Sequence, residues 1–113
     1  MDLYYDRQGN PMTVEEWAEA MAHLFDRVVA KTSVVETPSS SDSQAVEVST
    51  VWLGINHNWT GSGRPIIFET MVFGGPIDQE MWRYATEQEA VAGHREVVRL
   101  VQMALQVEEI ERR

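Results

Sequence analysis

The segment from Ser49 to Pro76, STVWLGINHNWTGSGRPIIFETMVFGGP, constrains the fold of this chain more than any other part. It contains five of the seven glycines and two of the four tryptophans. Two runs rich in β-branched and aromatic residues flank the polar stretch 56–65, which contains glycine and proline. Such runs on either side of a turn are typical of paired antiparallel strands. The segment therefore predicts two long strands at the centre of a sheet.

The first of these strands, expected over 45–57, raises a question of register. Its apolar residues change face along the strand: Val46 and Val48 first, then Val51, Leu53 and Ile55. A bulge near residues 49–50 would turn both sets toward the core, because one inserted residue reverses the face. Alternatively, the strand is covered on both sides and Trp52 packs against a neighbour on the second face.

Two amphipathic helices are expected. The first begins at Thr13, which forms a capping box with Glu16, and ends near Asp26. Its apolar face holds Val14, Trp17, Ala18, Met21, Leu24 and Phe25. The second helix opens at Thr86 with another capping box to Glu89. Its apolar face holds Ala90, His94, Val97, Val98, Val101, Ala104 and Leu105.

Further strands are expected over 2–7, 27–36, 66–73 and 81–84, which completes the order β-α-β-β-β-β-α. Runs of strands joined by short loops indicate an α+β fold with a mainly antiparallel sheet. We expect the two helices to pack on one face of that sheet. The chain is predicted to form a single domain over 1–113, with a surface loop at 37–44 and a polar tail that frays over 108–113.

Composition excludes several kinds of site. The chain of 113 residues has no cysteine, which excludes disulfides, thiolate catalysis and Cys-ligated zinc. Its net charge of −9 opposes direct binding to nucleic acid or anionic membrane and suits a basic protein surface. An acidic surface that serves solubility alone is the simpler alternative. The polar N-terminus does not resemble a signal peptide, so a cytoplasmic location is expected.

The polar stretch is the candidate binding site. Asn56, His57 and Asn58 offer hydrogen-bond donors and acceptors, and Trp59 offers a stacking surface. Arg64 provides a planar cation for a carboxylate or phosphate. The alternative is a hairpin turn in which these residues only shape the backbone, with Trp59 folded onto the sheet.

Glu69 interrupts an apolar strand, so its carboxylate is expected at an edge, in a pocket or in an ion pair. Arg83 on the next strand is the expected cross-strand partner. His94 and His23 are expected to be packed, hydrogen-bonded side chains rather than ligands. Three scattered histidines without cysteine give no metal motif, and no catalytic motif or cofactor site is evident.

Four stretches resemble a family of small uncharacterised proteins of actinobacteria and their bacteriophages: DRQGNPMTVEEWA, STVWLGINHNW, IFETMVFGGP and MWRYATEQEAVAGH. The similarity spans Asp6 to about Val98, and the string from Phe68 to Pro76 is the most specific part. Family members often have an acidic residue where this chain has Asn56. The resemblance implies a phage or prophage setting and no established reaction.

Three functions are weighed. The leading hypothesis is a non-enzymatic phage accessory protein, a homodimer that binds a host or phage protein through apolar sheet residues, Trp52 among them. A small-molecule binder is the second, with Trp59 stacked on a nucleotide base and Arg64 on its phosphate. The third is an enzyme that uses Glu69 and His57, which requires both side chains to share a cleft.

Overall fold

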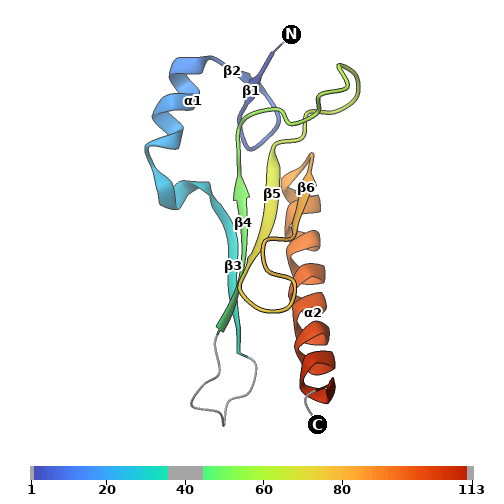
Figure 1. The fold of residues 1–113 in the computed structure, drawn as a ribbon. Helices are drawn as coiled ribbons and strands as arrows, with labels where there is room; N and C mark the ends of the chain where they lie inside the picture. The colour runs from blue at the N-terminus through green and yellow to red at the C-terminus, as the bar shows by residue number, and fades with distance from the viewer. Residues whose placement is uncertain (1, 36–44, 112–113) are drawn as a thin grey trace.

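A four-stranded antiparallel sheet and one long helix form the two layers of the molecule (Figure 1). The computed structural model describes residues 2–35 and 45–111. The strands lie side by side in the order β3 (Val28–Val35), β4 (Ala45–Trp52), β5 (Phe68–Phe73) and β6 (Met81–Tyr84). Helix α2 (Glu87–Glu111) packs against all four strands. The predicted α+β fold with an antiparallel sheet is confirmed.

The N-terminal elements form a smaller unit at one end of the sheet (Figure 1). Strands β1 (Tyr4–Tyr5) and β2 (Pro11–Met12) make a two-stranded hairpin, and α1 (Val14–Met21) and the 3-10 helix η1 (Leu24–Arg27) follow. A backbone bridge between Tyr4 and Ile55 connects this hairpin to the segment that follows β4. Strand β2 was not expected, because two residues of which one is proline carry no strand pattern.

Of the two helices expected on one face of the sheet, α2 covers that face along its length. Helix α1 lies at the end of the sheet (Figure 1), where its Trp17, Ala20 and Met21 pack against the buried cluster that includes Trp52 and Ala90. Its main contacts are with β1 and η1. The helix ends at Met21, five residues earlier than expected, and none of its residues is fully buried. Leu24 and Phe25 therefore leave the predicted apolar face and lie in η1, where their exposed fractions are 67% and 93%. A helix of eight residues is only about 12 Å long, too short to cover the sheet.

Strand β4 is regular, and the bulge expected near residues 49–50 is absent from it. Every even position of β4, from Val46 to Trp52, is buried against α2. The parity is kept because Thr50, a polar residue, takes an inward position that an apolar residue was expected to fill. The irregularity of register lies instead on β3, between Val28 and Ala30.

Strands β4 and β5 are shorter than expected at the ends next to the 56–65 loop: β4 ends at Trp52 and β5 begins at Phe68. The backbone turns at Gly54. This residue has φ +72, and a Cβ there would lie 2.7 Å from the Trp17 indole, so only glycine fits. Helix α2 continues to Glu111, beyond the start of the tail expected to fray from 108. The loop expected at 37–44 lies outside the described residues.

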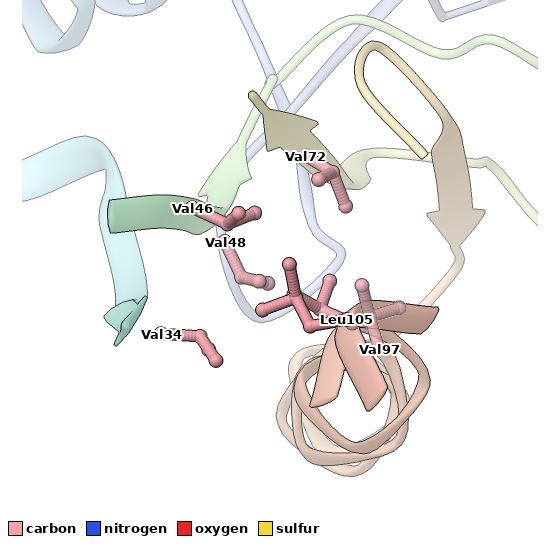
Figure 2. Packing of buried hydrophobic residues seen from close by; sticks show 7 residues of the cluster. Val34, Val46, Val48, Val72, Val97 and Leu105 are labelled. Atoms are coloured by element: carbon pink, nitrogen blue, oxygen red, sulfur yellow. The ribbon is translucent and has the colours of Figure 1, made fainter. Parts of the chain in front are cut away.

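The core between the sheet and α2 is divided by a polar layer. On one side lies a cluster that Figure 2 shows: Val34, Val46, Val48, Val72, Val97, Val101 and Leu105. On the other side lies a second cluster: Trp52, Ile67, Phe68 and Ala90. Thr50, Thr70 and His94 stand between them, at most 4% exposed. Each central strand and the helix contribute one polar residue at the same level.

Candidate functional site

The face of the sheet turned away from α2, termed the open face, is the first candidate surface. Because side chains alternate along a strand, the positions between the buried ones point to this side. The cross-strand register places the open-face residues in rows. One row is Lys31, Ser49, Met71 and Met81; its neighbours are Ser33, Glu47 and Phe73, and Val51, Glu69 and Arg83. In the described part of the chain, α2 is the one helix laid along the sheet, and it covers the other face.

The open face combines apolar side chains with ion pairs. Phe73 is 45% exposed and Met81 is 44% exposed. Met71 is half-buried; it lies two residues before Phe73 on β5 and opposite Met81 of β6. Lys31 pairs with Glu47 at 2.9 Å, and Arg83 with Glu69 at 3.1 Å. The second pair confirms the predicted partner of Glu69. An apolar centre flanked by satisfied charges is the pattern of a surface that contacts another protein.

His57 lies near the Glu69–Arg83 pair at one end of the open face. Burial and the positive charge of Arg83 lower the pKa of His57, and the nearby Glu69 carboxylate opposes them. The ring of Trp59 stands edge-on to His57, with 5.5 Å between ring centroids, and 72% of Trp59 is exposed. The structure thus brings three of the expected residues together: His57, Trp59 and Glu69. Because Arg83 holds Glu69, the carboxylate is engaged in the pair rather than in a cleft with His57.

Asn56 and Asn58 hold the backbone of the 56–65 loop. The Asn56 Oδ1 accepts hydrogen bonds from the backbone N–H groups of Asn58 and Ile66, at 2.8 and 3.0 Å. The Asn58 amide donates to the carbonyl oxygens of Ser62 and Arg64, at 2.8 and 2.9 Å. Both side chains therefore use their hydrogen bonds within the loop, as the turn interpretation of this segment expected.

Arg64 and the pocket beside the loop offer little to a nucleotide. One Arg64 Nη donates to Glu89 Oε1 at 2.9 Å, which connects the loop to the first turn of α2. The adjoining pocket, lined by Tyr5, Asn56 and Asn58 among others, has a volume of about 120 Å³. Ligand sites usually measure about 300 Å³ or more. The geometry favours a structural role for this loop.

Trp52 was expected on the second face of the sheet and is buried on the α2 side. It is 4% exposed, and its Nε1–H donates to the Tyr5 carbonyl at 3.1 Å. The regular alternation of β4 through Thr50 places it there. Trp52 thus joins the sheet to the N-terminal hairpin and is not available to a partner.

A buried hydrogen-bonded chain was not foreseen from the sequence. His94 Nε2 lies 2.8 Å from Thr32 Oγ1, and His94 Nδ1 lies 2.7 Å from Thr50 Oγ1. Thr50 Oγ1 is in turn 2.5 Å from Thr70 Oγ1. Burial lowers the pKa of His94, so the ring is neutral at pH 7. The prediction that His94 is packed and hydrogen-bonded is confirmed, and the continuous alternation of β4 was the signal for Thr50.

Comparisons of the chain with protein-family models, with curated proteins and with solved structures gave no match. Within residues 2–35 and 45–111, no three His, Asp or Glu side chains gather as metal ligands would. No helix in the same ranges combines the length and apolar character needed to cross a membrane.

Proposed function

We propose that this protein is a non-enzymatic binding protein that docks a basic protein partner on the open face of its sheet. The observation that carries the proposal is the exposure of Phe73 and Met81 beside Met71 on a sheet face without a covering helix among the described elements. Large apolar side chains gathered on one face mark contact surfaces more often than single exposed ones do.

Charge supports the choice of partner. The net charge of −9 raises the encounter rate with a positively charged protein and lowers it with an acidic one. The ion pairs Lys31–Glu47 and Glu69–Arg83 are already satisfied, so a partner can bury them without leaving a charge unpaired. In the phage setting that the sequence resemblance implies, the partner would be a host or phage protein in the cytoplasm.

A matched pair of variants tests the proposal. Phe73 and Phe25 are both exposed, but Phe25 lies in η1, away from the open face. A basic partner is first enriched on immobilised wild-type protein. We expect Phe25→Ser to bind this partner as the wild type does, and Phe73→Ser to bind it about tenfold or more weakly. Binding should also weaken as salt is added.

The proposal fails if Phe73→Ser retains the partner, if Phe25→Ser loses it equally, or if the enriched protein is acidic. Both phenylalanines are surface residues, so each variant should keep its fold, and circular dichroism checks this.

A small-molecule function for the 56–65 loop remains the second candidate from the sequence. Only the exposure of Trp59 favours it, since the amide groups of Asn56 and Asn58 are used within the loop. Titration of Trp59 fluorescence with nucleotides would test it against the Trp59→Phe variant.

A further inference from the structure

Strand β3 is a long edge strand. It has eight residues, and within the described part of the chain it pairs with β4 alone. Its outer side therefore presents unpaired backbone N–H and C=O groups, which another extended strand satisfies best. The opposite edge strand, β6, has only four residues. Proteins usually protect an edge by shortening it or by placing charges on it, and β3 is not short.

The charge on β3 does not protect its edge. Lys31 is the one charged residue of the strand, and its Nζ lies 2.9 Å from Glu47 Oε1 on β4. The ammonium group is thus held over the interior of the sheet rather than beyond the edge. The remaining side chains of β3 are Val, Ala, Thr and Ser, which favour strand pairing.

A groove runs beside this edge, between β3 and α2. Its volume is about 520 Å³. The strand side consists of Thr32, Ser33, Val34 and Val35, and the helix side includes Val98 and Gln102. Glu109 is its only charged lining residue, although 24% of the whole chain is charged. The edge and its groove are thus unusually poor in charge for this acidic protein.

We propose that β3 pairs antiparallel with β3 of a second copy of this chain, which joins two four-stranded sheets into one of eight strands. An antiparallel pair about a two-fold axis is self-complementary, because each residue meets the same partner from both copies. With Thr32 opposite Thr32, Lys31 faces Ser33 across the axis, and no like charges meet. A groove with one charged lining residue, Glu109, suits a strand whose one charge, Lys31, is already paired with Glu47, whereas a basic peptide would find few carboxylates there.

The pairing uses the edge of the sheet and leaves the open face of both copies free. It therefore does not depend on the docking function proposed above. It would place the two open faces side by side as one continuous surface.

Light scattering on purified full-length protein tests the proposal without any partner. We expect a mass of twice 12.9 kDa in the micromolar range. Ser33→Lys places a second lysine opposite Lys31 of the other copy, and the two-fold axis repeats that repulsion. The dissociation constant of the dimer should rise by about tenfold or more, so that the variant is a monomer at the same concentration. Met81→Lys adds the same charge to the same face at the opposite edge and should stay dimeric.

A cysteine variant gives a second measurement that does not depend on repulsion. Because the chain has no cysteine, Ser33→Cys carries a single thiol. A short thiol cross-linker should join two copies of Ser33→Cys covalently and leave Met81→Cys without a cross-link. A wild-type monomer, a dimeric Ser33→Lys, or equal cross-linking of both cysteine variants would overturn the pairing at β3.

Discussion

At the scale of single residues, one histidine and three threonines form a hydrogen-bonded layer between α2 and the sheet. Both ring nitrogens of His94 are within hydrogen-bond distance of a threonine hydroxyl, Thr32 on one side and Thr50 on the other. A neutral imidazole has one donor and one acceptor, and a hydroxyl can serve either. The two hydroxyls can therefore satisfy both nitrogens of a neutral ring, and burial, which penalises the charged form, keeps the ring neutral.

Stability should decrease when His94 is forced to take up a proton. Its pKa in the folded protein is lowered by burial from the ordinary 6.5. Below pH 6.5 the unfolded chain binds a proton that the folded chain does not, so unfolding becomes more favourable until the pH reaches the folded pKa. Above pH 6.5 this effect should vanish.

Urea denaturation at a series of pH values measures this dependence, and the His94→Gln variant should lose part of it. His57 has a lowered pKa as well, so His57→Gln is the matched control. An NMR titration in which His94 protonates above pH 6.5 would contradict the prediction.

The two buried threonines of the central strands should not be equivalent. Thr50→Val removes the partner of both His94 Nδ1 and Thr70, so it should cost about 1–3 kcal/mol of unfolding free energy. Thr70→Val leaves the Thr50–His94 bond in place and should cost about 1 kcal/mol. Chemical denaturation ranks the two. Equal losses would show that His94 does not depend on Thr50.

At the scale of elements, the sequence predicts the regular elements better than the places where they meet. The extent of β3 follows from its β-branched residues, that of β6 from its aromatic residues, and the start of α2 from the Thr86 cap, which are local signals. The early end of α1 and the turn at Gly54 depend on contacts between distant segments, such as Trp17 with Gly54. Local pattern does not encode such contacts.

The candidate site follows the same division. The cross-strand pair of Glu69 and Arg83 was predictable from strand alternation. The inward position of Thr50, and with it the burial of Trp52, was not predicted. Unbroken alternation from Val46 and Val48 leads to both residues, but a polar residue on a strand ordinarily suggests the solvent side. That one residue decided which face of the sheet is open.

Gly93 of α2 lies directly against Tyr84 of β6. A Cβ on Gly93 would overlap the ring of Tyr84. Glycine to alanine in a helix usually stabilises by about 0.5–1 kcal/mol. Here overpacking should reverse the sign, so Gly93→Ala should lower the unfolding free energy by about 1–3 kcal/mol.

Chemical denaturation gives the sign, and a double variant gives its cause. Adding Tyr84→Ala to Gly93→Ala removes the ring, so the alanine at 93 should no longer destabilise relative to Tyr84→Ala alone. A stabilised Gly93→Ala would contradict the close contact.

At the scale of the whole molecule, the chain combines a firmly packed part with a lightly packed one. Helix α2 and the sheet hold nearly all fully buried residues, whereas α1 and η1 hold none. The two parts are joined by side chains such as Arg7, whose guanidinium bonds to Glu87 at 2.6 Å and to the Asp26 carbonyl at 2.9 Å. Few buried apolar contacts indicate a segment that opens locally.

Amide hydrogen exchange should therefore separate the two parts. Residues 14–27 are expected to exchange through local opening, well before the amides of β4 and β5, which should require global unfolding. Native-state exchange followed by NMR or mass spectrometry measures both. Equal protection in the two parts would show that α1 unfolds together with the sheet.

The polar layer in the core also fixes how the helix is aligned on the sheet. Apolar side chains lie on either side of the layer, valines such as Val48 and Val97 on one side and Trp52 and Ala90 on the other, so a helix shifted by one turn would still find apolar neighbours. In that shifted position, however, His94 would face an apolar side chain, and the hydroxyls of Thr50 and Thr70 would lose their partner in the helix. Each buried polar group without a partner costs about 1–3 kcal/mol. Apolar burial alone would allow several alignments of α2 on the sheet, and the polar layer favours one of them.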